Sequence, residues 1–309
     1  INELRPGQAI SSQCAPGANT FQTPGVSLVP CLVAGTGFFS SAATNLVDQI
    51  RPYRGYRSIT MMSPRFNSNY HSLQVSAQHR FARESQVNLA YTWSKNLTDS
   101  QNDRSNAPQN SYDIRSEYSR ATLDRRHVFS LNYIYELPFF RNQEGLTGKL
   151  LGGWQASGIV TYNTGVPFTA TTSTYDPAGL GFIPAAIAGG RPNLLCDPNE
   201  NAPHTQQQFF NTACFERNPA TTATNLSNTP GSAGRGVING PDTKRVDFTM
   251  TKNIRFNESL RLQLRGEAFN VFNHTNFRNI STNVTAANFG QVTTVRDPRT
   301  IQLGVKFYF

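Results

Sequence analysis

The chain has 309 residues, a net charge of +9 and 15% charged residues, and its mean hydropathy is −0.44. Its polarity therefore comes mainly from Asn, Ser, Thr, Gln and Gly, and no apolar run approaches the roughly 18 residues of a transmembrane helix. The basic residues are scattered, and the densest group is interleaved with acidic residues, which argues against nucleic acid as a partner. A basic rim that faces anionic lipopolysaccharide or an anionic ligand fits the charge better.

Residues 1–50 carry no distinctive pattern and are predicted to form a loop-rich N-terminal segment, followed by a second unit over 51–309. The sequence starts at Ile1 without Met or a signal-like stretch, so we interpret it as a piece of a longer precursor. Four cysteines in loop-like sequence predict two local disulfides on the extracellular side, Cys14–Cys31 and Cys196–Cys214. Free thiols or a metal site are the alternatives, although the spacings match no zinc pattern.

From residue 53 onward, segments with alternating apolar and polar residues follow one another. The clearest is the C-terminal one, where Ile301, Leu303 and Val305 alternate with Gln302 and Lys306. One apolar and one polar face over about ten residues is what a membrane-spanning β-strand needs, although an edge strand of a soluble sheet alternates in the same way. In chain order the eight predicted strands are 53–62 (the weakest), 71–83, 86–97, 125–138, 149–163, 243–256, 259–272 and 299–309.

The connections between these strands alternate in length. Short ones lie near 83–85, 139–148 and 257–258, and long ones span about 98–123, 164–242 and 273–297. Outer-membrane barrels have short periplasmic turns and long extracellular loops, so a periplasmic C-terminus would place all three long connections outside. The pattern predicts an all-β fold: an antiparallel transmembrane β-barrel, here in part, with long extracellular loops that are solvated and mobile.

Each strand is predicted to turn polar residues to the lumen and apolar residues to lipid. The predicted lumen face comprises Gln74, Gln78, Ser130, Asn132, Gln263, Arg265 and Gln302. Arg265 and Glu267 could form an ion pair there. Two aromatic girdles are expected at the interfaces, and the alternative for these residues is an ordinary core. Their members are Trp93, Tyr162, Phe269 and Phe272 at the outer ends and Phe81, Phe139, Trp154, Phe256 and Phe307 at the inner ends.

Motifs for catalysis are missing from the sequence. It contains no nucleophile elbow, no HExxH and no Walker loop, and its five histidines are dispersed. We therefore expect no enzymatic activity, no cofactor and no metal site.

Several segments resemble the C-terminal barrel of Oar-like TonB-dependent receptors. They are NSNYHSLQVSAQHRF (67–81), YTWSKNLTDS (91–100), DRRHVFSLNYIYELPF (124–139), LLGGWQASGIVTYNTGVPFT (150–169), RLQLRGEAFNVFNHTNF (261–277) and FGQVTTVRDPRTIQLGVKFYF (289–309). The resemblance covers most of 51–309. It implies an outer-membrane barrel of about 22 strands with an N-terminal plug and a TonB box, of which this chain would be the C-terminal third.

The resemblance also implies partners and a role. The partners would be outer-membrane lipid, TonB acting through a plug outside this chain, and the barrel-assembly machinery, which reads a terminal aromatic signal (here Phe307 and Phe309). The role would be uptake of an unknown solute, such as an oligosaccharide, peptide or metal chelate, and no binding residue can be carried over. The alternatives are a non-transport barrel for adhesion or secretion, and a complete small barrel of eight strands.

Overall fold

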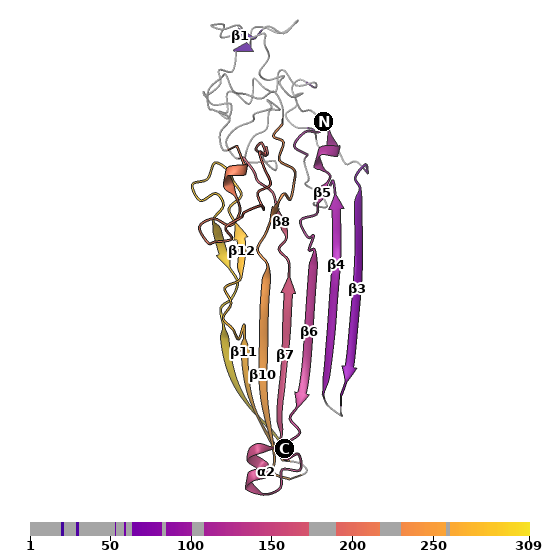
Figure 1. The fold of residues 1–309 in the computed structure, drawn as a ribbon, viewed down its shortest axis with the longest axis vertical. Helices are drawn as coiled ribbons and strands as arrows, with labels where there is room; N and C mark the ends of the chain where they lie inside the picture. Colours follow the sequence, from indigo (N-terminus) through magenta and orange to yellow (C-terminus); the bar gives the residue numbers. More distant parts are fainter. Residues whose placement is uncertain are drawn as a thin grey trace.

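One long antiparallel sheet dominates the structure (Figure 1). The computed structural model describes residues 20–21, 29–30, 53, 59, 64–81, 85–100, 108–172, 190–216, 230–257 and 260–309. The order of the sheet is β14-β11-β10-β7-β6-β4-β3, and the short strand β5 pairs with β4 at its side. The long strands are β3 (Ser68–Arg80), β4 (Gln86–Thr98), β6 (His127–Glu136), β7 (Trp154–Asn163), β10 (Thr243–Arg255), β11 (Arg261–Phe269) and β14 (Thr300–Tyr308).

These long strands confirm seven of the eight predicted ones, each paired with its neighbour among the predicted strands. Alternation of apolar and polar residues produces them because a half-buried strand shows its side chains to two different environments. The eighth predicted strand, 53–62, lies mostly outside the described residues. Tyr53 and Ile59 are described, and neither belongs to a strand.

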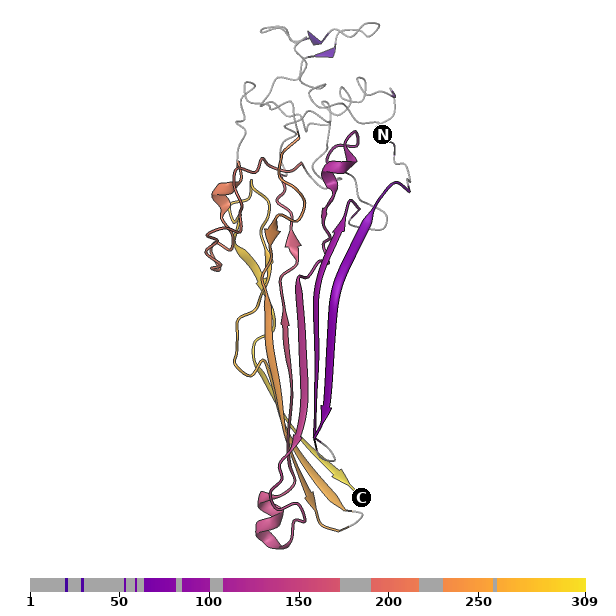
Figure 2. The ribbon, with the colours of Figure 1, turned by 45° about the vertical axis from the view of Figure 1, so that its right-hand side comes forward.

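The sheet is not closed. Among the described residues, β3 pairs only with β4 and β14 pairs only with β11, so the sheet has two unpaired edges. The sheet is twisted along the length of its strands, as the turned view in Figure 2 shows. This agrees with the prediction of an open sheet. In a complete small barrel the predicted strand 53–62 would pair with β14, and that strand lies mostly outside the described residues.

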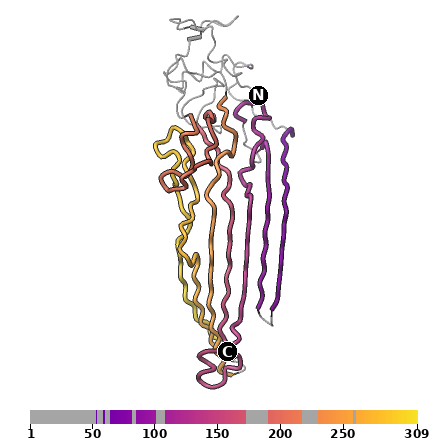
Figure 3. The backbone as a smooth tube through the Cα atoms, viewed as in Figure 1, coloured from indigo at the N-terminus to yellow at the C-terminus, as the bar shows by residue number. Residues whose placement is uncertain are grey.

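All long connections leave from the same end of the sheet, which we call the loop end, and all short ones from the opposite turn end, where the chain also finishes (Figures 1 and 3). The 137–153 connection at the turn end contains α2 (Gly145–Leu151). Residues 149–151 were predicted to start a strand and instead belong to this helix, so β7 begins at Trp154. In the described part of the chain, no helix is long and apolar enough to cross a membrane.

The long connections form a packed layer at the loop end. The remaining elements are β1 (Thr20–Phe21), β2 (Val29–Pro30), η2 (Ile114–Glu117), β5 (Ser119–Arg120), β8 (Pro167–Phe168), η3 (Thr212–Cys214), β9 (Ile238–Asn239), β12 (Phe277–Ile280) and β13 (Val292–Val295). We call the described residues within 99–126, 164–242 and 270–299 the loop layer. Among the described residues, the buried apolar cluster lies in this loop layer and not over the long sheet.

Candidate functional site

The predicted lumen residues all lie on one face of the sheet, which we call the polar face. The pairing register shows this directly, since residues opposite each other in an antiparallel pair share a face. In the half of the sheet formed by β3, β4 and β6, Gln78 lies opposite Asn88, and Asn88 lies opposite Asn132. At the other edge of the sheet, Glu267 on β11 lies opposite Gln302 on β14. Gln263 and Arg265 are four and two residues before Glu267 on β11, so they lie on the same face.

The remaining predicted lumen residues join this face in the same way. Gln74 lies opposite Thr92, and Ser130 opposite Ala90. The seven residues span both edges of the sheet, from β3 to β14, so they line a surface rather than a single compact site. Their orientation toward a lumen and their contact with a plug or solute remain predictions.

Hydrogen bonds and an ion pair join neighbouring strands and residues on the polar face. Asn88 donates to the Oδ1 of Asn132 at 2.8 Å. Gln263 donates to the Oδ1 of Asn253 on β10 at 2.9 Å. The ion pair expected between Arg265 and Glu267 is present, with 2.7 Å between nitrogen and oxygen. These contacts link neighbouring strands through their polar side chains and leave amide donors and acceptors on this face.

The opposite face is apolar and strongly exposed. Leu303 is 82% and Val305 73% exposed on the edge strand β14, and the same face continues through Leu264 and Leu131 to Val75. A contiguous apolar surface over a whole sheet is not stable in water, so this face requires lipid or protein against it. The described structure places nothing there.

Two residues lie on the face that their residue type does not suggest. Phe269 was assigned to the outer girdle, but it pairs with Thr300 on the polar face, and the Arg245 guanidinium lies 5.8 Å from its ring centre. Leu262 and Leu264 place the even-numbered residues of β11 on the apolar face. Phe269, an odd-numbered residue, therefore lies on the polar face. Lys252, in contrast, lies on the apolar face opposite Trp154, and it is buried.

A buried ion cluster joins two of the long connections. Glu117, from η2, is fully buried and binds Arg191 with 2.9 Å between Oε2 and Nη1, and it also pairs with Arg235. Its other oxygen accepts from the backbone N–H of Gln109 at 2.8 Å, and Arg191 donates to the carbonyl of Ala233 at 2.7 Å. Burial opposes the charge of Glu117, but the hydrogen bonds and attraction of the two arginines outweigh it and lower the pKa of this carboxyl.

An aromatic core joins the second and third long connections. The Phe210 ring packs edge-on against Phe215 at 5.8 Å and Phe289 at 5.3 Å between centroids. Ile280 and Val284 complete the contact from the third connection. The expectation that these loops are simply solvated is therefore wrong for the described part. They contain enough apolar side chains, spaced far apart in the sequence, to bury a core of their own.

The predicted disulfide between Cys196 and Cys214 is present, within the loop layer. It closes a segment that also carries Phe209 and Phe210 into the core. The second predicted bridge, between Cys14 and Cys31, lies outside the described residues.

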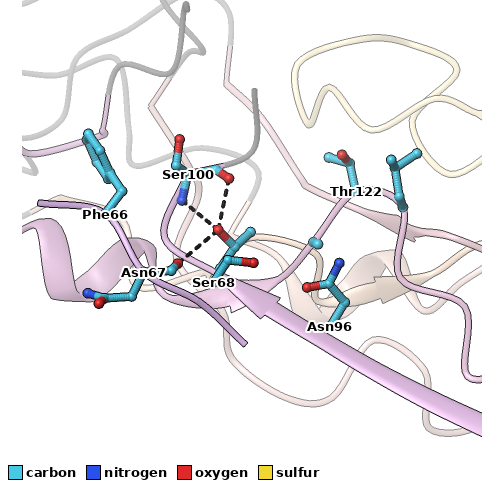
Figure 4. Close-up of a pocket in the computed structure, with 9 residues that line it drawn as sticks. Phe66, Asn67, Ser68, Asn96, Ser100 and Thr122 are labelled. Atoms are coloured by element: carbon cyan, nitrogen blue, oxygen red, sulfur yellow. Dashed lines mark hydrogen bonds between the residues drawn. The ribbon is translucent and has the colours of Figure 1, made fainter. Parts of the chain in front are cut away.

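A cavity of about 280 Å³ lies at the loop end of β3 and β4 (Figure 4). Polar and apolar atoms line it about equally. The backbone carbonyl of Asn67 accepts a hydrogen bond from the Thr98 hydroxyl at 3.0 Å, and this hydroxyl also donates to the Ser100 carbonyl at 2.9 Å. Small-molecule sites usually have about 300–1,000 Å³ and a largely apolar lining, so this cavity alone is a poor candidate for a binding site. Among the described residues, no group of three or more His, Cys, Asp or Glu side chains could hold a metal ion.

The comparison with known families agrees with this geometry. Residues 2–302 match the family described as outer membrane beta barrel domain. The chain belongs to this family. It is therefore an outer-membrane β-barrel protein, and the apolar face of its sheet is the one suited to lipid. No curated protein matches the chain.

For this outer-membrane barrel chain, sequence reasoning missed the loop layer. Glu117 is 74 residues from Arg191 and 118 from Arg235, so no local pattern connects them. The only local signal was the run of Phe209, Phe210 and Phe215 in otherwise polar sequence. Such a run predicts burial, but it does not say against which partner.

Proposed function

We propose that this chain is part of an outer-membrane receptor that takes up a solute, with the polar face lining the transport route and the loop layer forming its outer entrance. The observation that carries the proposal is the open sheet. In the described residues its polar face continues from β3 to β14 without closing, which supports a barrel that is completed by further strands and is wider than seven strands would give.

A wide barrel with a polar interior serves a solute too large for narrow pores, and the amide groups of the polar face can bind it by hydrogen bonds. The solute class that fits is an oligosaccharide, a peptide or a metal chelate. The resemblance to Oar-like TonB-dependent receptors supports energised uptake, in which TonB acts through a plug. The barrel-assembly machinery would insert the chain, and neither nucleic acid nor catalysis has a place in this function.

The ordered loop layer supports capture at the entrance. Two connections are joined by the Glu117 cluster and two by the aromatic core, so the entrance has a defined shape. A defined surface discriminates among solutes because binding does not first have to order it.

The test is an uptake experiment on the full-length gene product in cells with and without TonB. Labelled pools of oligosaccharides, peptides and ferric chelates are offered, and cell-surface binding is measured separately from internal accumulation. We expect one pool to accumulate only when both the receptor and TonB are present. Surface binding without TonB-dependent accumulation would reject the proposal in favour of an adhesion barrel, and accumulation that ignores TonB would reject the energised mechanism.

A further inference from the structure

The connection between β6 and β7 exposes apolar side chains at the turn end. Two residues suffice to join antiparallel strands, yet this connection runs from 137 to 153 and includes α2. Leu146 is 79% and Leu150 62% exposed, and Phe139, Phe140 and Leu151 are exposed as well. Figures 1 and 2 show α2 at the turn end of the sheet.

This connection is fixed to the sheet rather than loose. Gln143 is buried, donates to the carbonyl of Asn253 at 2.8 Å and accepts from the N–H of Arg255 at 3.0 Å. The N–H of Asn253 in turn donates to the carbonyl of Gly153 at 2.8 Å. The exposed leucines are therefore held in place, and their exposure is a property of the fold.

The side of the sheet on which α2 docks is the apolar one. Lys252 and Trp154 lie opposite each other on the apolar face. The Lys252 ammonium donates to the carbonyls of Leu150, at 3.0 Å, and Gly152, and the Trp154 indole donates to the same Leu150 carbonyl at 3.2 Å. These carbonyls are the open end of α2, so a cation there is favourable. The helix thus continues the lipid-facing surface.

One face of α2 packs against the rest of the connection, and the opposite face is exposed. Gly148 is buried, and a side chain at this position would meet the backbone of Gln143. Leu146 and Leu150 are four residues apart and share a face, away from that contact. Lys149 lies beside them, with its ammonium 5.8 Å from the ring centre of Phe256, which belongs to the predicted inner girdle.

We propose that α2 and its flanking phenylalanines form a membrane-interface anchor that dips into the periplasmic leaflet. Leu146 and Leu150 enter the acyl boundary, and Lys149 and the exposed Arg141 reach the phosphates. The occupant is phospholipid because the exposed surface is continuous with the apolar face, which the outer membrane already covers. This proposal is independent of any transported solute or of TonB.

The test uses the full-length protein reconstituted in vesicles of phosphatidylethanolamine and phosphatidylglycerol. Leu146→Cys is labelled with a thiol-reactive fluorophore, and quenching by brominated lipid is compared with quenching by aqueous iodide. Glu200→Cys, an exposed position in the loop layer, is the aqueous control, and Leu131→Cys on the apolar face is the lipid control. Mock labelling of the unsubstituted protein gives the background.

We expect the Leu146 label to be quenched by brominated lipid as at Leu131, and several-fold less by iodide than the Glu200 label. Strong iodide quenching with no lipid quenching would overturn the proposal, because α2 would then lie in water. Weak quenching by both agents would also overturn it, since a protein partner or a second copy would then cover the helix. Because Leu146 is largely exposed, its replacement leaves the docking bonds of the connection intact.

Discussion

Replacing Glu117 with glutamine should open the loop layer and leave the sheet folded. The substitution keeps the shape of the side chain and removes its charge. Two guanidinium groups that are almost completely buried, Arg191 and Arg235, would then lose their ion pairs with this carboxylate. Breaking one partner of a buried pair costs about 3–5 kcal/mol, because the remaining charge is left uncompensated.

The same carboxyl sets a pH dependence for the loop layer. The pKa of Glu117 is lowered in the folded protein by Arg191 and Arg235, in spite of the burial that opposes its charge. The unfolded loop therefore binds the proton more tightly than the folded loop. Stability from this group is fully present above the ordinary carboxyl pKa and is lost as the pH falls through the lower, folded-state pKa. Glu117→Gln should remove that acid dependence.

Hydrogen exchange on the protein in lipid measures both effects. The amides of Gln109 and Ala233 are bonded inside this cluster, and we expect their protection to fall more than about a hundredfold, since roughly 1.4 kcal/mol corresponds to a factor of ten. Amides of β6 should keep theirs. Glu200→Gln, at an exposed carboxylate of the same layer, is the matched control and should change little. Unchanged protection in Glu117→Gln would refute the reasoning that the ion cluster holds the loops together.

Three further predictions concern the membrane face, the C-terminus and the loop core. Leu131→Arg should destabilise the protein in lipid by about 2–4 kcal/mol, while Asn132→Arg on the polar face should be tolerated, so equal effects in a refolding titration would show the faces to be misassigned. Deleting Phe309, which is 98% exposed, should sharply reduce insertion of the full-length protein in cells and barely change urea unfolding in lipid; normal insertion would exclude a terminal assembly signal. Phe210→Ala should cost the loop layer about 3–5 kcal/mol, and proteolysis of the loops as slow as in the unsubstituted protein would contradict the core.

The strands of this chain could be predicted because their information is local. Lipid on one face and polar groups on the other impose a period of two, and the same phase correctly placed Gln78, Asn132 and Gln302 on one face. Applied strictly, that phase also places Phe269 on the polar face and Lys252 on the apolar one. Phe269 was misjudged because residue type was given more weight than position in the alternation, and no prediction was made for Lys252.

Other features depend on contacts that a sequence pattern does not contain. The helix α2 has seven residues, too few to show a helical period, and its position depends on bonds from Lys252 and Gln143. The loop layer depends on pairs such as Glu117 with Arg235 and Phe210 with Phe289, which lie far apart in the chain. The polar composition of the long connections led to the prediction of mobile loops. Composition is an average, and it hides the few apolar residues that pack together into a small core.

The central claim is that one face of the sheet meets lipid and the other an aqueous lumen. Spin labels placed one at a time along β6 in the reconstituted full-length protein test it most directly, with accessibility to oxygen and to a water-soluble nickel chelate measured at each position. We predict oxygen maxima at Phe129, Leu131 and Tyr133 and nickel maxima at Ser130 and Asn132, with a period of two. Accessibility that does not alternate, or that alternates with the opposite phase, would contradict the account.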